Sequence, residues 1–316
     1  MPLTLRQGSV TAITERADGL VRLEVDRLPC VAYVRLTGPV EVGDEVLVNE
    51  QARLLGLGSG GFDVLYANLT RGLGLQPDEG AHVMKLPYTP GQMALSHREE
   101  TDELAPSLNG MPVVCCTLHS QLAPVCAGLG EGLRIGYVQV PGGALPVSLS
   151  DAVRALKERG LLEVAIAAGG CLDGDVECVT VAAALAWAAE RGLDVVVCAV
   201  GPGIVGTGSR LGHGALALAD AANTACALGG RPVLAVRESA ADARERHRGV
   251  SHHTHAVLDL CLGDVVAAWP DEVATDGWKT ACAGLPLDHM GRSADEDPAF
   301  FRAAYAAGVV ARGLTG

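Results

Sequence analysis

Residues 194–210, DVVVCAVGPGIVGTGSR, decide the fold that the sequence predicts. The run Val195–Val200 is short, continuous and apolar, which is typical of a strand that a parallel sheet buries on both faces. A glycine-rich segment follows this strand, and a helical pattern at 214–228 follows the glycines. A strand, a glycine-rich turn and a helix in this order direct backbone N–H groups and the positive end of the helix dipole toward an anion.

The glycine-rich segment is the first candidate binding site. Its glycines allow positive φ angles and a close approach of the backbone to a ligand. We expect an anion-binding loop rather than a dinucleotide motif or a P-loop, and no Gly-Lys-Ser or Gly-Lys-Thr follows it. The predicted anion-binding residues of this loop are Gly201, Gly203, Gly206, Thr207, Gly208, Ser209 and Arg210. The alternative is a flexible connection between strand and helix.

From residue 111 onward, apolar runs of strand length alternate with helical patterns. Strands are expected at 112–118, 134–140, 163–168, 194–200 and 232–236, and helices at 121–129, 150–159, 179–191, 214–228 and 240–247. This alternation predicts an α/β fold with a mostly parallel, doubly wound sheet. Ligands of such sheets bind at the carboxyl ends of the strands.

The first hundred residues have a different pattern. Short alternating segments at 21–25, 31–36 and 45–48 are separated by turn residues such as Gly38-Pro39. Short strands at this spacing predict a small antiparallel barrel or sandwich. We therefore expect two domains, a β-barrel-like domain at 1–100 and an α/β domain with the ligand site at 101–316.

Charge and cysteine content limit the function classes. The net charge of −13, with no long basic stretch, disfavours binding to nucleic acid or to an anionic membrane. No basic leader and no apolar run of 18 residues are present, so a membrane span is not expected. The ten cysteines are scattered without a C-x-x-C pattern, which favours reduced thiols and a cytoplasmic location.

Polar residues follow the first and third predicted strands of the α/β domain. His119 and Ser120 come after the first strand and could act as a base and a nucleophile. The alternative is that Ser120 caps the helix that follows. Asp175 and Glu177 come after the third and could hold a divalent metal ion. The alternative is that these carboxylates form a turn and cap a helix.

The densest polar cluster is at 244–255, RERHRGVSHHTH, after the fifth predicted strand. Arg246 and Arg248 are predicted to bind an anion, and His252 and His253 to act as bases or metal ligands. A transition-metal site formed by two of these histidines with Asp175 is one hypothesis. An exposed, polar helix start is the other.

Several strings resemble an uncharacterised bacterial family, the domain-of-unknown-function family numbered three-eight-six-six. The strings are GPGIVGTGSR, RERHRGVSHHT, ANLTRGLG, VMKLPYTP, LHSQL, HMGR and DPAFF. The resemblance extends over nearly the whole chain. It implies a cytoplasmic bacterial protein and no known activity, cofactor or catalytic residue.

Three hypotheses for function follow. The first is an enzyme, a hydrolase or a transferase, that acts on a small anionic and perhaps phosphorylated substrate. His252, His253, Asp175 and His119 would be its catalytic residues, and Asp175, Glu177 and His252 would hold a divalent metal ion as cofactor. The second is a sensor that binds a nucleotide or metabolite without catalysis. The third is an assembly protein, and a homo-oligomer stays open in each case.

Overall fold

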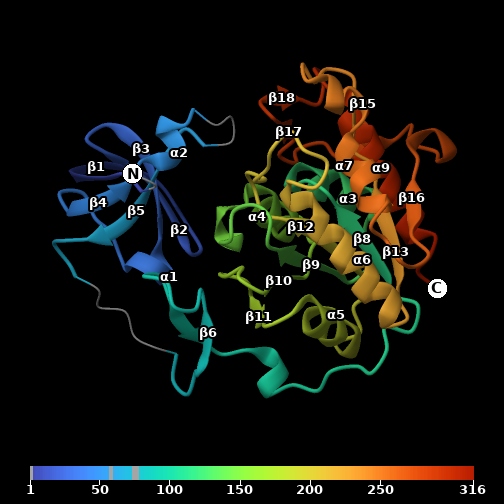
Figure 1. Ribbon diagram of the computed structural model, residues 1–316, viewed down its shortest axis with the longest axis horizontal. Helices are drawn as coiled ribbons and strands as arrows, with labels where there is room; N and C mark the ends of the chain where they lie inside the picture. The colour runs from blue at the N-terminus through green and yellow to red at the C-terminus, as the bar shows by residue number, and fades with distance from the viewer. Residues whose placement is uncertain (1–2, 57–59, 73–77) are drawn as a thin grey trace. The chain divides into compact units, whose positions relative to one another are not determined.

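The computed structural model describes residues 3–56, 60–72 and 78–316, in two units, Met1–Leu95 and Ser96–Gly316 (Figure 1). In the first unit, five strands close into a barrel in the order β1-β2-β3-β5-β4. Their bounds are Leu5–Ala17 (β1), Leu20–Val25 (β2), Leu28–Tyr33 (β3), Glu45–Asn49 (β4) and Asp63–Asn68 (β5). All neighbouring strands are antiparallel except β3 and β5. Alternating apolar side chains, among them Val10, Leu23 and Val46, fill the interior.

Short elements complete the first unit. They are α1 (Val34–Thr37), α2 (Gln51–Leu54) and the hairpin of β6 (Val83–Lys85) and β7 (Met93–Leu95). The turn between β2 and β3 consists of Asp26 and Arg27, which both have positive φ. A two-residue turn of this kind matches the twist of a hairpin and sets its register.

The second unit is built on a parallel sheet in the order β11-β10-β9-β12-β8-β13-β16. Its strands are β8 (Pro112–Cys116), β9 (Ile135–Val140), β10 (Val164–Ala168), β11 (Val176–Cys178), β12 (Val195–Val200), β13 (Arg231–Ala235) and β16 (Val266–Ala268). The side chains of the central strands β8, β9 and β12 are buried on both faces. This burial explains why these strands are continuous apolar runs rather than alternating ones.

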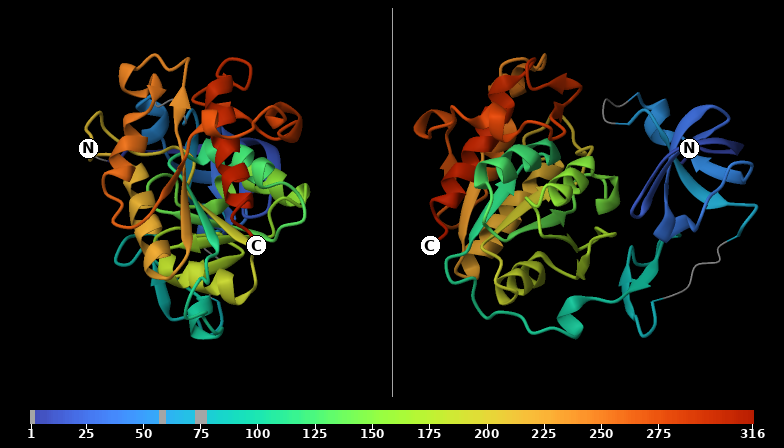
Figure 2. Two further views of the ribbon diagram at one scale, coloured as in Figure 1. Left: turned by 90° about the vertical axis from the view of Figure 1, so that its right-hand side faces the viewer. Right: turned by 180° about the vertical axis from the view of Figure 1, so that it is seen from behind.

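Helices cover both faces of this sheet (Figure 2). One face is packed by α3 (Leu122–Leu129), α4 (Asp151–Glu158), α8 (Trp278–Ala281) and α9 (Pro298–Arg312). The other is packed by α5 (Val181–Glu190), α6 (Ala217–Ala227) and α7 (His252–Leu258). The chain moves outward from β8 to β11 and then back to β12 and β13. Because crossovers are right-handed, this reversal changes the face on which the connecting helices lie.

Two small hairpins lie outside the sheet. One pairs β14 (Glu238–Ser239) with β15 (Gly249–Val250), and the other pairs β17 (Asp288–His289) with β18 (Arg292–Ser293). Single 3₁₀ turns are at Arg98–Glu100, His119–Gln121, Val147–Leu149, Gly214–Leu216, Glu245–His247 and Pro270–Glu272.

The predicted class is confirmed: the fold is mixed α/β, with a parallel sheet and a smaller N-terminal set of mostly antiparallel strands. The helix predicted at 240–247 is wrong, because this segment is the irregular connection between β14 and β15 and contains only a 3₁₀ turn. Strand β11 was not predicted, since it has only three residues and precedes α5 directly. Within the described residues, no helix is long and apolar enough to cross a membrane.

Helices α3 and α9 approach closely through two glycines. A methyl group on Gly128 would collide with the Tyr305 carbonyl oxygen, and one on Gly308 would collide with the Val125 carbonyl oxygen. We expect Gly128→Ala to lower the thermal midpoint by roughly 2–12 °C, because overpacking costs about 1–3 kcal/mol and outweighs the better helix propensity of alanine. Differential scanning calorimetry measures this. Gly170→Ala is the control, since its methyl group would meet no atom within 4 Å.

Candidate functional site

Four histidines meet beyond the carboxyl ends of β12 and β13. The loop after β12 ends at His213, immediately before the turn that leads into α6. The segment after β13 carries His247, and His252 and His253 are the first two residues of α7. The hydroxyl of Ser251 caps this helix by accepting the N–H of His253 at 3.2 Å, which fixes where the two histidines begin.

The histidine rings are packed against one another. The rings of His213 and His253 are stacked with their centroids 3.8 Å apart, and the His252 ring lies 4.6 Å from that of His253. One ring nitrogen from each of these three residues lies within 4.8 Å of the other two. The ring of His247 is adjacent, 4.9 Å from that of His252. We call His213, His252 and His253 the histidine cluster.

Several nitrogens at this place make no hydrogen bond of suitable geometry, although the backbone of Arg210 lies near the His213 ring. Among the described residues, both ring nitrogens of His213, Nε2 of His252 and Nε of Arg237 are buried without a hydrogen bond of suitable geometry. A buried polar atom without a partner costs about 1–3 kcal/mol, and native proteins contain few of them. Such atoms gathered in one cluster are typical of a site that a ligand completes.

The imidazoles of the site are held neutral. Burial, assisted by the charge of Arg237, lowers the pKa of His253 to about 2 and that of His247 to about 3. Burial also lowers the pKa of His213 and of His252. Neutral rings keep a lone pair on one nitrogen, so they can accept a proton or ligate a metal ion.

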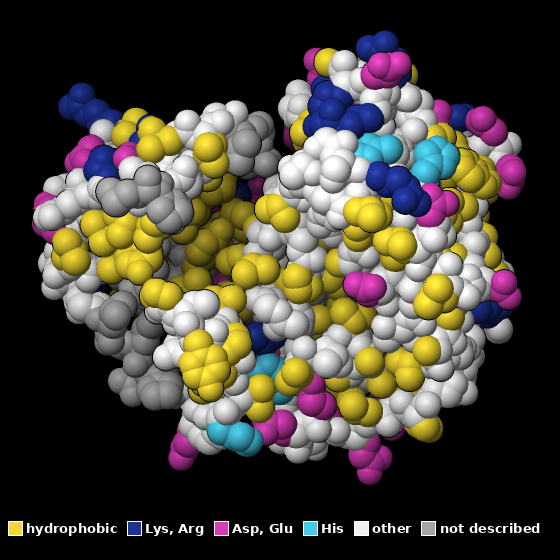
Figure 3. All heavy atoms as spheres, viewed as in Figure 1, with side chains coloured by type: hydrophobic (Ala, Val, Ile, Leu, Met, Phe, Trp, Pro, Cys, Tyr) yellow, Lys and Arg dark blue, Asp and Glu magenta, His cyan; other side chains and the backbone are white. Residues whose placement is uncertain are grey.

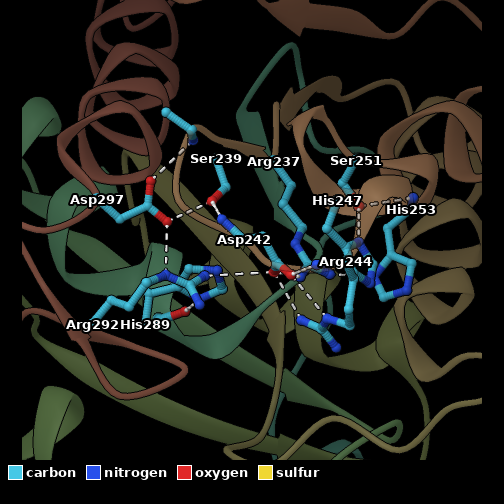
Figure 4. Close-up of polar contacts among 12 residues, drawn as sticks. Arg237, Ser239, Asp242, Arg244, His247, Ser251, His253, His289, Arg292 and Asp297 are labelled. Atoms are coloured by element: carbon cyan, nitrogen blue, oxygen red, sulfur yellow. Dashed lines mark hydrogen bonds and ion pairs between the residues drawn. The ribbon is translucent and has the colours of Figure 1, made fainter.

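A buried guanidinium lies beside the cluster (Figure 4). Arg237 follows β13, is 2% exposed and donates from Nη1 to Nδ1 of His253 at 2.9 Å. Burial lowers the pKa of Arg237 to about 10, so it still carries its charge at neutral pH. The hairpin of β14 and β15 positions it, because the carbonyl of Arg237 accepts the Ser251 N–H at 2.8 Å.

Two buried carboxylates partly neutralise the arginines of this region (Figure 4). Asp242 accepts two bonds from Arg244, at 2.9 and 2.8 Å, and lies 3.5 Å from Arg292 and 3.7 Å from Arg237. Burial alone would raise the pKa of Asp242, but hydrogen bonds from Arg244 lower it well below its usual range. Asp297 accepts from Arg292 at 3.1 Å and from the Ser239 hydroxyl at 2.6 Å.

The charge balance of this network is positive. Three guanidinium groups, those of Arg237, Arg244 and Arg292, face two carboxylates. Arg246 and Arg248 are exposed beside them and add further positive charge. Figure 3 shows histidine and Lys or Arg side chains gathered on this part of the second unit. The site is therefore electropositive in a chain whose net charge is −13.

The glycine loop serves this site chiefly by holding His213. Gly206 pairs with His213, where a Cβ would lie 2.9 Å from the Cβ of that histidine, so only glycine permits this approach. The N–H groups of Val205, Thr207 and Ser209 donate to acceptors within the protein, so these amides are not available to an anion. The predicted cradle of backbone amides is therefore smaller than expected.

The loop also differs from a dinucleotide-binding loop. The segment 201–206, GPGIVG, has the spacing G-x-G-x-x-G, but in that motif the helix starts directly at the glycines. Here α6 begins only at Ala217. Gly201 packs against the carbonyl oxygen of Ala144, and Gly203 has a φ of 69°. Their role in the structure is to shape the chain at the strand end.

The arginines predicted to bind an anion are not all at the cluster. Arg210 forms an exposed ion pair of 2.6 Å with Asp259, at the far end of α7. Arg246 lies beside the glycine loop, because a Cβ on Gly208 would be 3.8 Å from its Cζ. The charge of Arg246 also contributes to lowering the pKa of His252. Arg246 is therefore the exposed arginine best placed for a ligand of the cluster.

Asp175 and Glu177 are not at this site, which corrects the predicted metal set of Asp175, Glu177 and His252. Strand β11 is parallel to β10 without a helix between them, so the connection returns to the start of β10. Asp175 consequently lies at the amino edge of the sheet, where it accepts the Ala165 N–H at 2.7 Å and pairs with Lys157. Glu177 lies within β11. The histidines lie at the opposite edge.

His119 is also outside the cluster. Its Nδ1 donates to the Val200 carbonyl at 3.2 Å, and its Nε2 lies 2.7 Å from the Ser150 hydroxyl. Because a carbonyl only accepts, Nδ1 carries the proton, and in the neutral ring Nε2 accepts from the hydroxyl. His119 thus ties the end of β12 to the cap of α4. Ser120 instead faces His289, whose Nδ1 is 3.3 Å from the hydroxyl.

The sequence predicts no individual role for several central residues. His213 and Arg237 follow strands of the parallel sheet, and Arg244 and His247 belong to the polar cluster 244–255, so their positions were noted without an assignment. Asp242, His289 and Arg292 were not selected. Nothing in the sequence pairs Asp242 with Arg292, which is fifty residues away along the chain.

We expect Asp242→Asn to lower the free energy of unfolding by about 3–5 kcal/mol, because it leaves buried guanidinium groups without their counter-charge. The thermal midpoint should fall by roughly 6–20 °C in calorimetry. Asp259→Asn is the matched control, since its ion pair with Arg210 is exposed and contributes at most about 1 kcal/mol. Equal effects of the two substitutions would contradict the central role of Asp242.

Acid should destabilise the protein through its buried histidines. Burial lowers the pKa of His119 from 6.5 to about 4, so the unfolded chain takes up this proton first as the pH falls. The stabilising effect is complete above pH 6.5 and is lost between pH 6.5 and 4. Between pH 7 and 5, His119→Gln should lose up to about 2 kcal/mol less stability than the wild type in urea titrations. Parallel pH curves for the two proteins would show that His119 is not buried in its neutral form.

Comparison with known proteins leaves the activity open. A search of the curated proteins finds no match. The model of a family described as "Protein of unknown function (DUF3866)" matches residues 29–281. This range contains the histidine cluster, Arg237 and Asp242, whereas His289, Arg292 and Asp297 follow it. Since the match covers most of the chain, this protein belongs to the DUF3866 family.

Proposed function

We propose that this protein is an enzyme that binds a small anion, a phosphate ester or a carboxylate, at the histidine cluster and its arginines. The observation that carries the proposal is the gathering of unpartnered, buried nitrogens of His213, His252 and Arg237 in an electropositive site. Guanidinium N–H groups bind phosphate and carboxylate oxygens through charge-assisted hydrogen bonds. The location at the carboxyl ends of β12 and β13 is the usual ligand position in parallel sheets.

The chemistry expected is hydrolysis or group transfer. His252 is the most accessible residue of the cluster and is half-buried, whereas His213 and His253 are buried. As a neutral imidazole it can take a proton from water or from a substrate hydroxyl. Arg246 is exposed beside the glycine loop and would hold the anionic group of the substrate. Arg237 would supply, from its buried position, the remaining positive charge that neutralises this group.

A binding module without catalysis is the second candidate. It is favoured by the position of Ser251, whose hydroxyl caps α7 and lies 2.7 Å from Nδ1 of His247. This serine is fully buried, so a substrate does not reach it. A ligand that stabilises the protein strongly but is never consumed would favour this alternative.

Arg246→Ala tests the proposal. We expect inorganic phosphate to bind the wild type in calorimetric titrations, and Arg246→Ala to weaken this binding by about 10–100-fold, since a charged hydrogen bond is worth about 1.5–3 kcal/mol. Arg210→Ala is the matched control, because Arg210 pairs with Asp259 instead. Turnover of phosphate-ester and carboxylate-ester model substrates should decrease more in Arg246→Ala than in Arg210→Ala. Equal losses of phosphate affinity in both variants, or no anion binding by the wild type, would overturn the proposed function.

A further inference from the structure

The histidine cluster has the composition of a metal site rather than only that of a polar pocket. Its three ligand nitrogens come from two separate segments, the end of the glycine loop and the start of α7. They lie within 4.8 Å of one another. In the described part of the chain, no other group of three His, Cys, Asp or Glu side chains has donor atoms so close together.

The unsatisfied atoms indicate which ligand these rings need. His213 is more than nine-tenths buried, and neither of its ring nitrogens has a hydrogen-bond partner of suitable geometry. Nε2 of His252 has none either. A neutral imidazole carries one N–H and one lone pair, so an anion can satisfy the first but only a cation or a donor can satisfy the second. Arg237 donates to Nδ1 of His253, so the lone pair of this ring is occupied for as long as that hydrogen bond is kept.

We infer that His213, His252 and His253 bind one divalent transition-metal ion, such as Zn²⁺ or Co²⁺, and that Arg237 gives up its hydrogen bond to Nδ1 of His253 when the ion binds. Three imidazoles suit these ions, whereas Mg²⁺ and Ca²⁺ prefer oxygen ligands. Metal–nitrogen bonds of about 2.0–2.1 Å place neighbouring nitrogens of a tetrahedral site about 3.3 Å apart, so binding would draw the three rings together. This site goes beyond the proposed anion binding, which uses the N–H groups of the cluster and its arginines and not the ring lone pairs.

Three neutral ligands leave the full charge on the ion and one position open. An ion held in this way lowers the pKa of a bound water, or binds an anionic oxygen directly. The charges of Arg237 and Arg246 weaken the affinity for a bare cation and strengthen that for an anionic fourth ligand. The protein should therefore bind the metal ion more tightly when the anion is present, and the anion more tightly when the metal ion is present. This one expectation rests on the proposed function.

The test is titration of the purified full-length chain, first treated with a chelator, with Co²⁺ in a buffer without phosphate. We expect one ion per chain, with visible absorption of a nitrogen-coordinated cobalt site. His213→Gln and His252→Gln should each weaken binding at least 10-fold. His255→Gln is the matched control, because His255 is exposed on the same helix α7 and should bind as the wild type does. Circular dichroism confirms that each variant is folded. If His213→Gln does not fold, the result for His252→Gln, at a half-buried residue, decides whether the metal site exists.

The outcomes separate the two proposals. Absence of saturable Co²⁺ binding by the wild type, equal binding by all variants, or an intense thiolate-to-cobalt band from the cysteines would overturn the metal site. Phosphate binding by the chelated protein would leave the anion proposal standing in any of these cases. Arg246→Ala should bind Co²⁺ at least as tightly as the wild type and lose phosphate, so loss of metal binding in this variant would also contradict the assignment.

Discussion

The buried carboxylate of Asp242 is the interaction on which the candidate site depends. It is surrounded by Arg237, Arg244 and Arg292, which come from two hairpins far apart in the sequence. Without this counter-charge, a guanidinium that is 2% exposed could not stay beside the histidines, because burying an unpaired charge costs several kcal/mol. Burial, assisted by the charge of Arg237, lowers the pKa values of His247 and His253 and keeps both rings neutral. Asp242 contributes by holding this buried guanidinium in place.

The topology of the sheet determines which residues can join this site. Strands β12 and β13 flank the central strand β8, so the segments that follow them meet above it. The connection after β12 returns as a short loop, and the one after β13 forms the hairpin of β14 and β15 before α7 begins. Both deliver histidines to the same edge. The connection after β10 runs back to the start of that strand. Asp175 therefore lies at the amino edge of the sheet, away from the histidines.

The sequence predicted the parts of the fold that depend on local pattern. Continuous apolar runs identified β8, β9, β10, β12 and β13, and alternation identified β2, β3 and β4 but not β1 or β5 of the barrel. It could not predict β11, because three residues carry too little pattern. For the site, the density of histidines at 244–255 drew attention to His252 and His253, which the structure brings together with His213. Asp175 was misplaced because its position depends on whether a connection crosses the sheet or doubles back, and composition contains no such information.

The contrast between the local and the overall charge determines which anions we expect at the site. The chain carries a net charge of −13, whereas the arginines around Asp242 leave a local excess of positive charge. Charges are screened over about 8–10 Å at physiological ionic strength, so a small anion at the cluster experiences mainly the nearby guanidinium groups. We expect a polyanion such as nucleic acid to be disfavoured, because it would extend beyond the arginines over a chain of negative net charge. On the proposed function, the ligand is therefore a small, compact anion.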